Sequence, residues 1–142
     1  MKTIFCDIDG TLITHVNSGI SAQVPPEMLS SSLLQYPDIG TGIWPGLLPG
    51  TLEKLNEWQR KGYRIILTTG RPVSMRAATE RQLQSFGIFW DDLIMGLPNG
   101  QRVVINDLKA GVTTDDACLN VDRQTAAAFF IERNEGISKL DI

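Results

Sequence analysis

Residues 3–12 read T-I-F-C-D-I-D-G-T-L, and this stretch decides how the rest of the chain is interpreted. Its apolar run, with β-branched and aromatic side chains and Gly10 after it, is typical of a buried strand. Asp7 and Asp9 interrupt the run, and two carboxylates so placed repel each other and lose hydration. A hard divalent cation, which takes oxygen ligands, is the simplest partner that would offset them. The alternative is a turn with both acids in water, which the apolar run before Asp7 disfavours.

Composition predicts a soluble globular protein. The 142 residues suffice for a single domain over 1–142 with a core of its own, and 42% hydrophobic and 20% charged residues are ordinary values. No stretch approaches the roughly 18 apolar residues of a membrane span, so we expect no membrane partner. Met1-Lys2 leads straight into the strand and leaves no room for a signal peptide. We therefore expect a cytoplasmic protein whose Cys6 and Cys118 stay reduced.

The net charge of −3 and the lack of a long basic run argue against binding to duplex nucleic acid, which needs a basic patch. A small phosphorylated substrate remains compatible with this charge, because a bound cation and a few local donors can hold one phosphate.

Residues 13–49 carry little regular pattern and hold five of the seven prolines. One short helix is predicted over 26–35, with Pro26 in its first turn. A loop of this length in a compact domain is usually a lid or a binding loop. We interpret 13–49 as a flap or insert.

Strands and helices alternate in the rest of the chain, as judged from the spacing of apolar residues and from glycines after the helices. The predicted elements are helices over 51–61 and 73–86 and strands over 63–67, 92–95, 102–106 and 126–131. Such alternation builds an α/β fold with a parallel sheet and right-handed crossovers. Ligands of these sheets bind outside the carboxyl ends of the strands. Three polar clusters are expected at that edge: Asp7-Ile8-Asp9, Thr69-Gly70-Arg71 and Asn106-Asp107.

These clusters resemble the motifs of the haloacid dehalogenase-like (HAD) superfamily. Residues 7–12, D-I-D-G-T-L, resemble its first motif, 68–71, T-T-G-R, the second, and 105–107, I-N-D, the acidic fourth. The resemblance implies a Rossmann-like three-layer sandwich around a central parallel sheet. It also implies a small, minimally capped member of the phosphatase type, with the 13–49 flap in place of a large cap domain.

The resemblance assigns a role to each polar residue. Asp7 would be the nucleophile that takes the phosphoryl group and also a ligand of Mg²⁺. Asp9 would protonate the leaving oxygen and later activate water, while its main-chain carbonyl binds the metal and Asp107 completes the metal site. Thr69 and the amides around Gly70 would hold the phosphoryl oxygens. The dehalogenases of the family lack an acid at the place of Asp9, because halide leaves without a proton, so Asp9 favours phosphate chemistry.

The sequence departs from the family pattern at the lysine of the third motif. In the family, this lysine neutralises the charge of the nucleophile and of the transferred phosphate. The stretch 96–100, G-L-P-N-G, has leucine where this lysine is expected. Arg102 would start a strand whose other end forms the site, about 13 Å or more away. Lys109 follows Asp107 on the correct edge, so we prefer it as the phosphate-binding cation. Arg71 either binds substrate phosphate or fixes the loop after its strand, and the sequence leaves both open.

The sequence thus predicts a Mg²⁺-dependent phosphohydrolase that acts on a small phosphomonoester, a sugar phosphate for example, through an aspartyl phosphate. The missing lysine motivates an alternative, a phospho-ligand-binding or regulatory module with weak turnover or none. With so little cap, a partner subunit that covers the site is conceivable, so a homo-oligomer stays open. A two-component receiver domain is disfavoured, because its acceptor aspartate follows the third strand, where this chain has Met95-Gly96.

Overall fold

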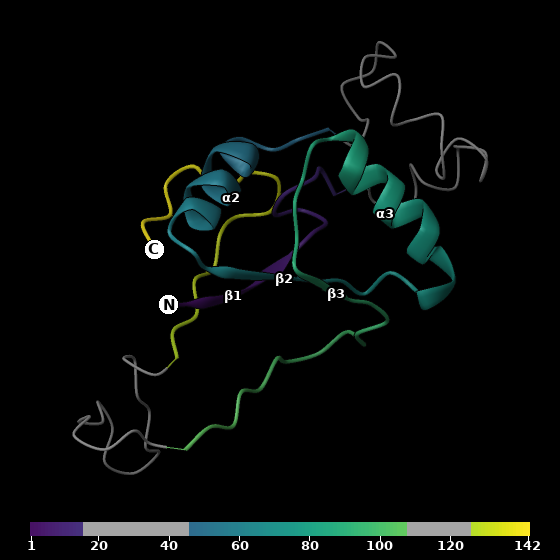
Figure 1. Ribbon diagram of the computed structural model, residues 1–142. Coiled ribbons are helices and arrows are strands. Elements are labelled where there is room, and N and C mark those ends of the chain that lie inside the picture. Colours follow the sequence, from purple (N-terminus) through teal and green to yellow (C-terminus); the bar gives the residue numbers. More distant parts are fainter. Residues whose placement is uncertain (16–45, 108–125) are drawn as a thin grey trace. The chain divides into compact units, whose positions relative to one another are not determined.

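The computed structural model describes residues 1–15, 46–107 and 126–142 (Figure 1). The chain divides into two compact units, Met1–Pro98 with Ile131–Ile142, and Asn99–Phe130. The helix predicted over 26–35 and the cation Lys109 lie outside the described residues.

The first unit is built on a parallel sheet of three strands in the order β1-β2-β3. The strands are β1 (Thr3–Asp7), β2 (Arg64–Thr68) and β3 (Asp92–Ile94). Asp7 lies opposite Thr68, and Thr68 lies opposite Ile94, so the three carboxyl ends share one edge. The predicted α/β fold with a parallel sheet is confirmed, and the first three strands differ from the predicted ones by one or two residues.

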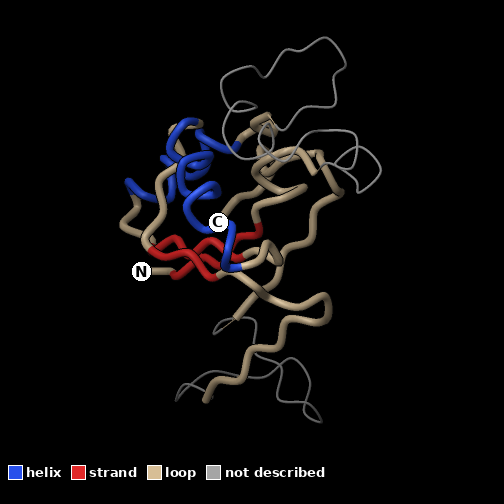
Figure 2. The backbone as a smooth tube through the Cα atoms, turned by 90° about the vertical axis from the view of Figure 1, so that its right-hand side faces the viewer, coloured by secondary structure: helices blue, strands red, loops and turns tan. Residues whose placement is uncertain are grey.

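Two helical segments connect consecutive strands. α2 (Thr51–Arg60) joins β1 to β2, and a short 3-10 turn η2 (Val73–Met75) leads into α3 (Arg76–Ser85) on the way to β3. The helices predicted over 51–61 and 73–86 are confirmed, the second as η2 followed by α3. Because the strand order follows the chain order and the crossovers have one hand, α2 and α3 cover the same face of the sheet (Figures 1 and 2).

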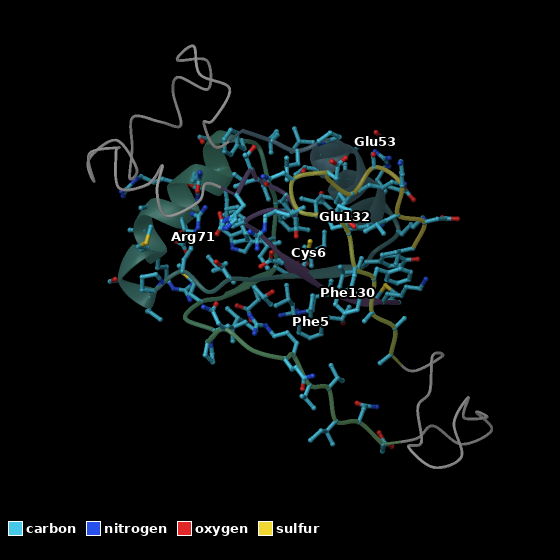
Figure 3. The ribbon with its side chains drawn as sticks, turned by 180° about the vertical axis from the view of Figure 1, so that it is seen from behind. Phe5, Cys6, Glu53, Arg71, Phe130 and Glu132 are labelled. Atoms are coloured by element: carbon cyan, nitrogen blue, oxygen red, sulfur yellow. The ribbon has the colours of Figure 1, made fainter. Side chains whose placement is uncertain are left out.

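The core lies between these helices and the sheet, and it follows from alternation along the strands. Cys6 in β1 is buried on the helical side, whereas its neighbour Phe5 is 63% exposed on the other side (Figure 3). Leu55 and Trp58 of α2 and Leu83 of α3 are buried and belong to the same core cluster. Among the described residues of this unit, helices therefore cover one face of the sheet. No helix in the described part of the chain is long and apolar enough to cross a membrane.

The C-terminal residues of this unit form no helix or strand, yet they are anchored on the loops around the sheet. Ile137 is 1% exposed, and its N–H donates to the carbonyl of Pro49 at 2.9 Å. The N–H of Asn134 donates to the carbonyl of Gly10 at 2.9 Å, and its Oδ1 accepts from the N–H of His15 at 2.6 Å. This C-terminal turn thereby ties the loop after β1 to the loop before α2.

Two predicted strands are wrong. Residues 102–106 are irregular, and Val103, Val104 and Ile105 are 73, 71 and 93% exposed. Residues 126–131 form no strand either, and Phe130 is 94% exposed. β-branched and aromatic residues form a strand only where a neighbouring strand takes up their backbone hydrogen bonds. Within the described residues, the sheet of β1, β2 and β3 includes neither segment.

Candidate active site

The predicted acid pair lies at the carboxyl end of β1. Asp7 is the last residue of the strand and is exposed, and its Oδ2 accepts a hydrogen bond from Thr11 Oγ1 at 3.2 Å. The chain then turns tightly, because the N–H groups of Leu12 and Ile13 both donate to the carbonyl of Ile8, at 2.9 and 3.1 Å. Gly10 within this turn has a φ of 86°, a left-handed conformation that favours glycine. The turn leaves Asp7 and Asp9 at the same end of the strand.

Thr69 and Gly70 follow β2 at the same edge of the sheet. Thr69 is 2% exposed, and its Oγ1 accepts the N–H of Arg71 at 3.1 Å. Since a hydroxyl has one proton to donate and two lone pairs, this bond leaves the O–H of Thr69 available for an acceptor such as a phosphoryl oxygen. Gly70 is exposed, and a Cβ there would lie only 3.2 Å from the carbonyl oxygen of Leu97.

The segment after β3 runs beside Thr69 and Gly70, the candidate phosphate-binding residues. The N–H of Leu97 donates to the carbonyl of Thr69 at 3.2 Å, and the N–H of Gly96 donates to the carbonyl of Arg71 at 2.8 Å. The position at which a lysine was expected therefore lies beside Thr69. Leucine at that position supplies no charge.

Arg71 supplies a positive charge to the acid pair in a way that sequence reasoning missed. Its Nε donates to Asp9 Oδ2 at 2.9 Å and its Nη2 to Asp9 Oδ1 at 2.7 Å, a bidentate ion pair. Its Nη1 donates to Thr79 Oγ1 at 3.2 Å and to Gln82 Oε1 at 2.6 Å. Figure 3 shows Arg71 beside α3. The sequence does contain one indication of these contacts with α3. Thr79 and Gln82 are polar residues three apart on a predicted helix, next to the apolar residue Leu83, so both lie near its buried face.

The remaining predicted site residues belong to the second unit or lie outside the described residues. Asp107 belongs to the second unit, where it is exposed and its oxygens accept hydrogen bonds from Asn106 Nδ2. The place of Asp107 in the metal site stays a prediction, and so does the role of Lys109 as the phosphate-binding cation. Arg102, also in the second unit, donates from Nη1 to the carbonyl of Gly100. Within 1–15, 46–107 and 126–142, no group of three or more histidine, cysteine or acidic side chains could hold a metal ion.

The donors that are present fit a hard cation. Asp7 offers a carboxylate and Asp9 its main-chain carbonyl, both oxygen ligands of the kind that Mg²⁺ prefers. The Asp9 carboxylate is engaged by Arg71, which suits a carbonyl rather than a carboxylate contact with the metal. Cys6, beside Asp7, offers no thiolate, because burial and then the charge of Asp7 raise its pKa from 9.0 to about 12.

The raised pKa of Cys6 makes a prediction of its own. Because the thiol of the unfolded chain loses its proton near pH 9.0 and that of the folded chain near 12, its contribution to the free energy of unfolding is full below pH 9 and falls as the pH rises toward 12. At pH 8.5, iodoacetamide should label Cys6 at least about 100-fold more slowly in native protein than in urea, because only an accessible thiolate reacts. Mass spectrometry of the Cys6 peptide measures both rates, and equal rates would contradict this description of the thiol.

Comparison with known proteins identifies the family. The model of the HAD superfamily, subfamily IIIB (acid phosphatase), matches residues 1–113. The chain belongs to this family. The resemblance read from the three motifs is thereby confirmed, and so is the Rossmann-like α/β fold that it implied.

Comparison with solved structures also finds similarities to this HAD-family chain. A chain in the structure of the Pnkp1/Rnl/Hen1 complex is 27% identical over 72% of this chain and 30% of its own, with a TM-score of 0.47. D,D-heptose 1,7-bisphosphate phosphatase from B. bronchiseptica, complexed with magnesium and phosphate, is 18% identical over 67% of this chain and 49% of its own, with a TM-score of 0.37. The chain thus spans less than a third of the length of the first of these. No curated protein matches it significantly.

Proposed function

We propose that this HAD-family protein is a Mg²⁺-dependent phosphohydrolase that acts on small phosphomonoesters, sugar phosphates for example, through an aspartyl phosphate on Asp7. The observation that carries the proposal is the shared edge: Asp7 ends β1 and Asp9 lies in the turn after it, Thr69 follows β2, and Arg71 is bonded to Asp9. Membership of an acid phosphatase family supports the same reaction class.

The reaction divides into two displacements. In the first, Asp7 Oδ forms a bond to phosphorus while the bond to the leaving oxygen breaks, and the protonated Asp9 gives its proton to that oxygen. In the second, water attacks the phosphorus of the aspartyl phosphate and Asp9 takes a proton from it. The bond between phosphorus and Asp7 breaks, inorganic phosphate is released, and both acids return to their starting states.

Phosphate binding and charge neutralisation complete the site. Thr69 would donate its O–H to a phosphoryl oxygen. Because the backbone at Gly70 is exposed, the amide N–H groups there would be accessible to the same phosphate. The Asp7 carboxylate, the Asp9 carbonyl and Asp107 would hold Mg²⁺. When bound, the cation would supply the positive charge that lets one anion attack another.

The proposal is tested by phosphate release from a panel of phosphorylated metabolites. Each substrate is assayed with Mg²⁺, with EDTA, and with EDTA followed by excess Mg²⁺. We expect release with Mg²⁺, a loss of about 100-fold or more on chelation, and recovery on addition, because the charge effect of the cation is lost without it. Turnover that chelation leaves unchanged would contradict the metal requirement. Calorimetric binding of a phosphorylated ligand without turnover under any metal would instead support the phospho-ligand-binding module.

A further inference from the structure

We propose that Thr79 and Gln82 of α3 are positioning residues that fix Arg71, so that its guanidinium orients the carboxyl group of Asp9 for proton transfer. This inference rests on the proposed function and names residues that act through another residue rather than on the substrate.

Two buried side chains of α3, Thr79 and Gln82, bind Arg71. Thr79 is 0% and Gln82 6% exposed, so each presents a polar oxygen inside the protein. Buried polar groups are costly unless they are hydrogen-bonded. The oxygens of both side chains accept from the same atom, Nη1 of Arg71, at 3.2 and 2.6 Å. The interior face of α3 therefore fixes one end of the guanidinium.

The opposite edge of the guanidinium fixes Asp9. Nε and Nη2 lie in one plane with Nη1, so the orientation that α3 imposes is passed on to both carboxylate oxygens of Asp9. Each carboxylate oxygen has two lone pairs, and the bidentate pair uses one on each. One lone pair on each oxygen thus remains for proton exchange with a leaving group or water, in an orientation held by α3.

The number of N–H donors on the guanidinium decides between the two roles that the sequence left open for Arg71. Guanidinium has five N–H donors, and Asp9, Thr79 and Gln82 together use four of them. Bidentate recognition of a phosphate needs two adjacent donors. Arg71 in this arrangement has at most one left, so it acts on Asp9 and not as a phosphate fork.

The test compares substrates that differ in their need for a proton. An alkyl phosphate such as glycerol phosphate expels an alkoxide, which needs protonation by Asp9, whereas p-nitrophenyl phosphate expels a stabilised phenolate that does not. In Gln82→Leu and in Thr79→Val, kcat/KM for glycerol phosphate, which reports the first displacement, should fall about ten-fold or more, a part of the usual effect of a general acid. For p-nitrophenyl phosphate, kcat/KM should stay within about two-fold, because its first displacement needs no proton, whereas the second displacement is common to both substrates and does not enter kcat/KM.

Matched variants separate this effect from a general loss of structure. Gln84→Leu makes the same chemical change at an exposed position of α3 and should leave both substrates unaffected. Thr79→Ser and Gln82→Glu keep an acceptor oxygen and should restore the wild-type ratio of the two kcat/KM values. Should Gln82→Leu fail to fold, Arg71→Lys makes the same test, because lysine keeps the charge but lacks the fork.

An equal fall of kcat/KM on both substrates would overturn the inference in favour of a structural or a phosphate-binding role. Wild-type protein without turnover of either substrate would overturn the proposed function, and with it this inference. The two failures are therefore told apart by the wild-type assay alone.

Discussion

An Asp7→Asn variant should release phosphate about 1,000-fold more slowly than the wild-type protein or not at all, because an uncharged amide cannot take the place of the attacking carboxylate. Asn and Asp have nearly the same shape, and Asp7 is exposed at the end of β1, so the fold should be retained. The measurement is initial phosphate release with Mg²⁺, beside thermal unfolding curves of both proteins.

Asp92→Asn is the matched control. Asp92 is also exposed and is the first residue of β3, at the end of the strand opposite to the proposed site. It should keep turnover within about two-fold of the wild type, as is usual for an exposed residue away from the site. An Asp7→Asn variant with wild-type turnover would refute the assignment of the nucleophile. If both variants lost activity equally, the loss would reflect a general effect of charge.

A Gly136→Ala variant should lose about 3 kcal/mol of unfolding free energy or more. Gly136 has a φ of 81°, a conformation that costs about 1–2 kcal/mol for a residue with a Cβ. A Cβ at this position would also overlap the carbonyl oxygen of Pro49, which is a backbone atom and cannot move aside cheaply. Relieving such an overlap adds roughly 1–3 kcal/mol. Urea denaturation of the wild-type protein and the variant gives the difference.

Gly87→Ala isolates the first of these two costs, that of the backbone conformation. Gly87 has a similar φ of 74°, but a Cβ there would meet nothing within 4 Å. It should cost only about 1 kcal/mol, for the backbone conformation alone. Equal costs at the two glycines would show that the C-terminal turn can move away from Pro49, and that it does not hold the loop before α2.

The local part of the site was predictable because its signals lie within single strands. The apolar run before Asp7 and the strand before Thr69 each show the period and composition of a buried strand, and polar residues follow both directly. Parallel pairing then brings the two carboxyl ends together without further information. The same reasoning failed for 102–106, because β propensity describes the residues of a strand and says nothing of whether a partner strand is present.

The long-range part was not predictable from pattern. Arg71 was identified, but its bonds to Asp9 on one side and to α3 on the other depend on how the guanidinium spans two elements. Asn134 likewise has no periodicity that points to Gly10 or His15, more than a hundred residues earlier. Such contacts arise from packing between segments, which the apolar period of either segment does not encode.

The C-terminal turn also bears on where this protein can be divided. The family match ends at residue 113, whereas Ile137 is buried and Asn134 bonds to the loop that follows Asp7. The part of the chain that matches the family model, residues 1–113, therefore leaves out Ile131–Ile142, which belongs to the same compact unit as the sheet. A shortened chain that ended at residue 113 would therefore lack the contacts between Asn134 and the loop that follows Asp7.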